Sequence, residues 1–230
     1  MLHIRYYGKS QPTPDLSVKN LVWLSSRQAL ADLATFITSI TRTHQLSGAW
    51  VALGGSYPGS LAAWLRLKYP HLVAAAVSSS APLLAKVDFF EYLEVVEQSL
   101  NTVPGCVESV KTAISDVEKL VLDRSWSMLT DWFRLCSQFD GDNNNDVINL
   151  FESLIGNFEG VVQYNKDNRA FEGFQWQNVT IDTVCNIMTS DEVGGSALER
   201  LTRVNDISLA MEGQKCLDHT YKSEVTIIDP

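Results

Sequence analysis

The chain has 230 residues, of which 45% are apolar and 20% charged, as expected for a folded protein with a proper core. Its formal net charge of −9 and its pI near 4.9 argue against nucleic acid and anionic membrane surfaces as partners. No run reaches the roughly 18 apolar residues of a membrane span, and the opening MLHIRYYGKSQPTP lacks the apolar region of a signal peptide.

The first part of the chain, residues 1–82, begins with a strand and a helix. His3–Tyr7 is a short strand-like run before a glycine. Ser25 and Gln28, three residues apart, predict a capping box. Apolar residues then recur every three or four positions up to Ile40, which predicts an amphipathic helix of about four turns.

Two further strands follow, with a helix between them. The apolar runs 50–53 and 74–77 predict strands that are buried on both faces. Residues 60–69 predict a helix that ends at Pro70. Alternating strands and helices are typical of a parallel α/β sheet.

The second part of the chain, residues 83–230, shows no convincing alternating strand. Asp88 and Glu91 predict a capping box before a helix that runs towards Leu100. Four more helices are expected, at 107–122, 125–139, 146–158 and 191–204. This part is therefore predicted to be a mostly helical domain.

The cysteines and one sequon point to the secretory route. All four cysteines fall in the second part of the chain, at Cys106, Cys136, Cys185 and Cys216, and an even number fits a disulfide framework. Asn178 opens an Asn-Val-Thr glycosylation sequon. Free thiols in a cytosolic protein are the alternative. No C-x-x-C pair occurs, so we expect no zinc, and no pattern predicts another metal or cofactor.

The sequence Gly54-Gly55-Ser56-Tyr57-Pro58-Gly59 joins a predicted strand to a predicted helix. This is the setting of a nucleophile elbow, in which a serine occupies a tight, strained turn that lifts its hydroxyl clear of the sheet. Glycines fit because side chains there would collide with the neighbouring strand and helix. The serine would be the nucleophile, and the N–H of Tyr57 at the start of the helix would stabilise an oxyanion.

The match to the elbow pattern G-x-S-x-G is not strict. Pro58 stands where the second glycine is usual, and the glycine moves to position 59. Proline is acceptable if it opens the helix, where its missing N–H has no partner. A glycine-rich helix start that only packs closely on a strand is the alternative.

The stretch GGSYPGSLAAWLRLKYPHLVAAAVSSSAPLLAKVDFFEYLEVVEQSL resembles the serine peptidase family of lysosomal Pro-X carboxypeptidase, dipeptidyl peptidase II and thymus-specific serine protease, and most of all its thymus-specific branch. RYYGKS, LSSRQALADLATFI and CLDHTY are also similar to that family. The resemblance implies an α/β-hydrolase sheet with an inserted helical cap, and cleavage of short peptides, often next to proline, through acylation of Ser56. It also implies the disulfides Cys106–Cys185 and Cys136–Cys216, because sequence alone leaves three pairings open.

A catalytic serine needs an imidazole and an acid. After Ser56 come His71, on a helix that leads away from the elbow, and His219, which directly follows Asp218; neither is expected to be the base. In the family, the acid and the histidine follow the cap. We therefore expect an internal fragment of a longer enzyme, or an incomplete gene model, that is inactive alone. The family usually has Glu-His where this chain has His3 and Ile4.

Two other functions stay open at this point. One is an esterase or lipase of the same fold, which the predicted disulfide-bearing cap and the Gly-Gly-Ser-Tyr elbow argue against. The other is a non-catalytic homologue or truncated isoform that only binds. For the peptidase we expect short peptide substrates and a lysosomal, endosomal or extracellular location. The oligomeric state and the choice between amino-terminal dipeptides and carboxy-terminal residues are not predicted.

Overall fold

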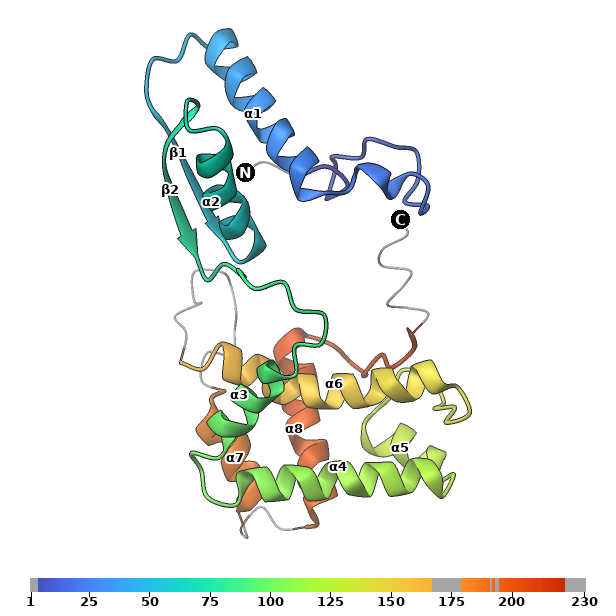
Figure 1. Ribbon diagram of the computed structural model, residues 1–230. Helices are drawn as coiled ribbons and strands as arrows, with labels where there is room; N and C mark the ends of the chain where they lie inside the picture. The colour runs from blue at the N-terminus through green and yellow to red at the C-terminus, as the bar shows by residue number, and fades with distance from the viewer. Residues whose placement is uncertain (1–3, 167–178, 191, 193–194, 222–230) are drawn as a thin grey trace. The chain divides into compact units, whose positions relative to one another are not determined.

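The computed structural model describes residues 4–166, 179–190, 192 and 195–221 (Figure 1). The chain divides into two compact units, with the boundary between Asp88 and Phe89. We call them the sheet unit and the helical unit. The mixed α/β character expected from the sequence is confirmed, with a small parallel sheet and two disulfides.

Among its described residues the sheet unit contains two strands and two α-helices, with a short 3-10 helix before them. In chain order they are η1 (Leu21–Trp23), α1 (Ser26–Thr43), β1 (Trp50–Gly55), α2 (Tyr57–Lys68) and β2 (Val73–Ser79). The Oγ of Ser25 accepts a hydrogen bond from the N–H of Gln28 and caps α1, as the sequence predicts. Apolar residues of α1, α2 and β2 form one core: Ala29, Leu30, Ile37, Leu61, Leu65 and Val73.

The strands β1 and β2 pair in parallel, and α2 packs against both of them (Figure 1). Burial along β1 alternates, so Ala52 is half-buried, whereas Val51 and Leu53 are 47% and 74% exposed. The prediction of strands buried on both faces is therefore wrong for this structure. Only one face of the sheet is covered by a helix in the part of the chain that the structure describes.

The strand predicted over His3–Tyr7 is also wrong for the described residues from position 4 onwards. These residues form a turn, in which Tyr6 has a φ of 70° and the Tyr7 N–H donates to the Ile4 carbonyl. Arg5 makes two hydrogen bonds of 2.6 Å to the carboxylate of Asp32 on α1. A bidentate pair of this kind fixes the turn to the helix.

The helical unit contains six α-helices among its described residues (Figure 1). They are α3 (Glu91–Leu100), α4 (Cys106–Leu122), α5 (Trp126–Trp132), α6 (Asn144–Gln163), α7 (Ile181–Thr189) and α8 (Ala197–Glu212). Their buried faces share one core, which includes the fully buried Val117, Leu129, Phe133, Leu150, Leu154 and Leu201. No helix among the described residues is long and apolar enough to cross a membrane.

Two predicted helices differ most from the structure at their ends. The helix predicted over 125–139 ends at Trp132, because Arg134 adopts a positive φ of 52° and the chain turns to pair Leu135 with Leu217. The helix predicted over 191–204 instead begins at Ala197. There Ser196 and Glu199 form a reciprocal capping box.

Helix α7 was not predicted, and the cap predicted for α3 is absent. Thr180 and Thr183 cap α7 reciprocally, a pairing without the acid or amide that usually marks a capping box. Helix α3 begins after Phe90, which has no side-chain cap bond, so the capping box expected from Asp88 and Glu91 does not form.

Two disulfides tie the helical unit together. The structure pairs Cys106 with Cys185 and Cys136 with Cys216, which is the pairing that the family resemblance implies. The first joins the start of α4 to the middle of α7 in the core, where both cysteines are 0% exposed. Cys136 is exposed, and its N–H donates to the carbonyl of Leu217.

Removing the disulfide between Cys136 and Cys216 should lower the free energy of unfolding by about 4 kcal/mol, because the bridge closes a loop of about 80 residues in the unfolded chain. The double substitution Cys136→Ala with Cys216→Ala tests this in urea and leaves no unpaired thiol. The matched pair Cys106→Ala with Cys185→Ala should lose more, since it also removes buried packing. Equal losses from the two double variants would contradict this expectation.

Candidate nucleophile elbow

Ser56 lies in the one-residue turn between β1 and α2. Its φ of 57° and ψ of −136° fall outside the regions that a non-glycine residue normally adopts. Such backbone strain persists only where the surroundings hold it, and it is concentrated at functional sites. The strained strand-to-helix turn is the geometry that the sequence predicts for an elbow.

Hydrogen bonds to the end of β2 hold this turn. The N–H of Ser56 donates to the carbonyl of Ser79 at 2.9 Å, and the carbonyl of Ser56 accepts from the N–H of Gly59 at 2.8 Å. The hydroxyl of Ser78 donates to the Gly59 carbonyl, and that of the fully buried Ser60 donates to the Pro82 carbonyl. No motif in the sequence marks these two supporting serines in advance. The sequence feature that could have indicated them is the small polar residues near the elbow, in PGS (residues 58–60) and SSS (residues 78–80).

Two of the three glycines around Ser56 occupy positions where a side chain would crowd the backbone. A Cβ on Gly54 would lie 2.1 Å from the carbonyl oxygen of Pro58, and one on Gly59 would lie 3.0 Å from that of Gly54. A Cβ on Gly55 would meet nothing closer than 4.0 Å. The predicted collision therefore applies to Gly54, the contact at Gly59 would be tight, and Gly55 has room for a methyl group.

The hydroxyl of Ser56 is open to solvent. The side chain is exposed, and it makes no hydrogen bond within the described chain. The N–H of Tyr57, at the first position of α2, also donates to no described acceptor. An unpaired N–H at a helix amino terminus favours negative charge, so the Tyr57 N–H can stabilise an oxyanion that forms beside Ser56.

A small aromatic pocket lies beside Tyr57. It has a volume of about 260 Å³, and its walls include Tyr7, Leu24, Tyr57 and Trp64. The rings of Tyr57 and Trp64 meet edge to face, with their centroids 6.3 Å apart. Arg5 also lines the pocket, although its guanidinium is engaged by Asp32. The pocket can therefore receive an apolar group next to the elbow.

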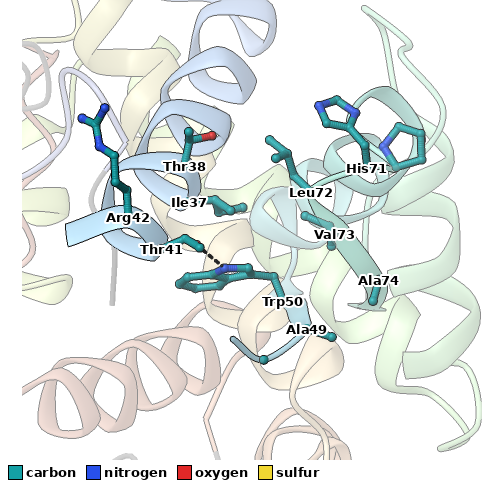
Figure 2. A pocket seen from close by; sticks show the side chains of 12 residues that line it. Ile37, Thr38, Thr41, Arg42, Ala49, Trp50, His71, Leu72, Val73 and Ala74 are labelled. Carbon is teal, nitrogen blue, oxygen red and sulfur yellow. Dashed lines mark hydrogen bonds between the residues drawn. The ribbon is translucent and has the colours of Figure 1, made fainter. Parts of the chain in front are cut away.

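The described histidines of the sheet unit do not lie at the end of the sheet where Ser56 is. Figure 2 shows His71 at a second pocket, together with Trp50 and Val73, which begin β1 and β2. This pocket has a volume of about 480 Å³. Ser56 follows the other end of β1, a strand of about 20 Å. His44 follows the end of α1, where Thr41 accepts a hydrogen bond from the indole of Trp50.

His219 belongs to the helical unit and is 1% exposed. Its ring lies 5.5 Å from that of Phe139, and Nδ1 has no hydrogen-bond partner in the described chain. Burial lowers the pKa of His219 below its usual 6.5, while the carboxylates of Asp146 and Asp218 act in the opposite direction. The ring of His219 is therefore a buried, packed group. His3 and Asn178 lie outside the described residues.

Comparison with known protein families agrees with the geometry of the elbow. The sequence profile of the family described as Serine carboxypeptidase S28 matches residues 1–228. The chain belongs to the serine carboxypeptidase S28 family. This is a family of serine peptidases of the α/β-hydrolase type, so the resemblance found in the sequence is confirmed.

Relatives within the S28 family include two named enzymes. The chain is 34% identical to mouse thymus-specific serine protease over 237 residues, which cover 97% of this chain and 45% of that protein. The human thymus-specific serine protease is 35% identical, with coverages of 97% and 44%. Mouse lysosomal Pro-X carboxypeptidase is 39% identical over 145 residues, 58% of this chain and 29% of its own. The chain thus spans less than half the length of these curated relatives.

The stability of the helical unit should fall with acid because of His219. A lowered pKa in the folded state means that the neutral ring is favoured by folding, so its contribution is complete above the unfolded pKa of 6.5 and is lost as the pH falls below it. Urea unfolding between about pH 8 and about pH 5 measures this. His219→Gln should flatten the pH dependence. The exposed His71→Gln should not change it, and equal effects would contradict the assignment.

Proposed function

We propose that the full-length S28 protein containing this chain is a serine-type exopeptidase that cleaves short peptides through acyl transfer to Ser56. The observation that carries the proposal is the strained turn at Ser56, with an exposed hydroxyl and an unpaired N–H on Tyr57. Membership of a serine peptidase family supports it. The mouse relative named lysosomal Pro-X carboxypeptidase suggests cleavage near proline.

The proposed reaction has two steps. The Ser56 oxygen bonds to the carbonyl carbon of the peptide, its proton passes to a base, and the oxyanion accepts a hydrogen bond from Tyr57 N–H. The C–N bond then breaks, and the amine leaves with the proton. Water attacks the ester in the second step, which releases the acid and restores the hydroxyl.

We propose that the base and its acid come from parts of the full-length protein outside these 230 residues. The described imidazoles of the sheet unit lie away from the elbow, and the ring of His219 is buried. These 230 residues alone should therefore not turn over substrate. The residues of the second part of the chain would form the cap, and the aromatic pocket beside Tyr57 would receive an apolar substrate group.

Labelling with a fluorophosphonate tests the proposal, since this reagent reacts with an activated serine. In the full-length protein the modified residue, located by peptide mapping, should be Ser56. Hydrolysis of dipeptide amides in preference to p-nitrophenyl esters would separate a peptidase from an esterase. Labelling at another serine would contradict the assignment of Ser56.

A non-catalytic binding protein is the second candidate function. It is favoured by the absence of an imidazole beside Ser56 within the described residues of the sheet unit. A full-length protein that binds peptides but is not labelled would support it.

We also propose a location in the secretory pathway, at the cell exterior or in lysosomes. The two disulfides support this, because such bonds persist in oxidising compartments. The sequon at Asn178 supports it too.

A further inference from the structure

The aromatic pocket beside Tyr57 lies at the end of the sheet where Ser56 is. The last turn of α1 accepts a hydrogen bond from Trp50, which begins β1. The first residues of α1, Ser25 and Ser26, line the pocket together with Tyr57. Helix α1 thus spans the sheet from one end to the other, and its start is beside the end of β1 (Figure 1). A group held in the pocket therefore lies next to the elbow.

Three aromatic side chains line this pocket, and a ligand can reach them. Tyr7 and Tyr57 are 55% and 40% exposed, and Trp64 is half-buried behind the ring of Tyr57. Aromatic rings favour edge-to-face or offset contacts with other aromatic rings, beyond the gain from apolar burial alone. The rings that line the pocket therefore favour an aromatic group over an aliphatic group.

The pocket offers no unpaired charge to a ligand. Arg5 is the one arginine, lysine, histidine or acid among the described residues that line it, and both oxygens of the Asp32 carboxylate accept hydrogen bonds from its guanidinium. A charged group would lose hydration there without gaining an ionic partner. The ligand that fits best is therefore an uncharged aromatic side chain.

Two contacts hold the turn that carries Tyr7. The two 2.6 Å hydrogen bonds from Arg5 to Asp32 attach the turn to α1, and a bidentate pair fixes orientation as well as distance. The hydroxyl of Tyr6 donates to the carbonyl of Asn20 on the other side of the turn. The place of the Tyr7 ring at the pocket therefore depends on the pairing of Arg5 with Asp32.

We propose that this pocket selects peptides with an aromatic side chain beside the cleaved bond. Tyr7 is then a specificity-determining residue, and Arg5 and Asp32 are positioning residues that act through it. The inference rests on the proposed function for the statement that the ligand is a substrate. The binding of an aromatic group is independent of that function and can be measured separately.

Binding of N-acetylphenylalaninamide to the full-length protein, followed by NMR titration, tests the pocket without any reaction. It should bind at least about tenfold more tightly than N-acetylalaninamide, because its ring is buried against the three aromatic side chains. Tyr7→Ala should reduce this preference to about threefold. Leu67→Ala removes an exposed apolar side chain near the far end of α2, and it should keep the full preference.

Hydrolysis distinguishes a positioning role of Arg5 from a purely structural one. Fluorogenic peptides that differ only by phenylalanine or alanine, on the acyl or the amine side of the cleaved bond, should differ at least about tenfold in kcat/KM on one of these sides. Arg5→Lys keeps the charge but loses the bidentate geometry, and it should lower this ratio about threefold through a higher KM for the phenylalanine peptide. General unfolding would lower both rates equally. Arg42→Lys, at an exposed position in the last turn of α1, is the matched control and should keep the ratio.

The outcomes separate this inference from the proposed function. Equal binding of the two amides, or a preference that Tyr7→Ala leaves unchanged, would overturn the pocket. A kcat/KM ratio of about one on both sides of the cleaved bond, with Ser56 still labelled by fluorophosphonate, would overturn the substrate selection and leave the peptidase in place. A ratio unchanged in Arg5→Lys would overturn the positioning role. Selective binding of the phenylalanine amide without labelling of Ser56 would support the pocket and contradict the proposed function.

Discussion

Ser56→Ala should abolish the peptidase activity of the full-length protein without unfolding it. Loss of the nucleophile should lower kcat by a factor on the order of 10⁶, because no neighbouring group can take over the covalent step. Stability should change by less than about 0.5 kcal/mol, since the hydroxyl is exposed and has no described partner. Alanine at position 56 would adopt the same strained backbone conformation as serine. Because its side chain is smaller than that of serine, it adds no new collision.

The measurement is hydrolysis of a fluorogenic peptide together with urea unfolding of the same preparations. Ser39→Ala, at an exposed position of α1, is the matched control and should keep full activity. If Ser56→Ala kept more than about 1% of the activity while Ser39→Ala kept all of it, a different residue would be the nucleophile.

Gly54→Ala should destabilise the sheet unit by about 3 kcal/mol, the upper end of the usual cost of overpacking. The new methyl group would lie 2.1 Å from the carbonyl oxygen of Pro58, which is backbone and cannot rotate away as a side chain can. Either β1 or the start of α2 must then shift, and Ser56 lies between them. We therefore expect full-length Gly54→Ala to lose activity as well as stability.

Gly55→Ala gives this experiment a matched control one residue away. Its methyl group would have ordinary contact distances, so stability should change by at most about 0.5 kcal/mol. Urea unfolding of both variants, with fluorophosphonate labelling of the full-length forms, compares them directly. Equal stability losses would show that the backbone at Gly54 relaxes and that close approach is not the reason for glycine there.

The fold was predictable where local signals and burial agree. Helix α1 has both an amphipathic pattern and a Ser25 cap, and its start was predicted correctly. Helix α7 was missed because Thr180 and Thr183 lack the usual capping residue types. The exposure of Val51 and Leu53 could not be read from their apolar character, because that character does not say what covers a face of the sheet.

The site was predictable because its backbone conformation requires particular residue types at particular positions. Glycine at 54 and 59 and serine at 56 predicted a strained turn, and the structure has one. The support from Ser60 and Ser78 depends on where the loop after β2 runs, which is a tertiary contact that no local pattern encodes. The aromatic pocket beside Tyr57 likewise combines residues from distant parts of the sequence.

The two disulfides of the helical unit overlap along the chain, since Cys136 lies inside the Cys106–Cys185 loop and Cys216 lies outside it. A single backbone cut anywhere between Cys106 and Cys216 therefore leaves the two pieces joined by at least one bridge. A protease that nicks this region would release no piece, and the nick would be visible on a gel only after reduction. The two disulfides thus keep the chain in one covalent piece after a single cleavage at any position in that region.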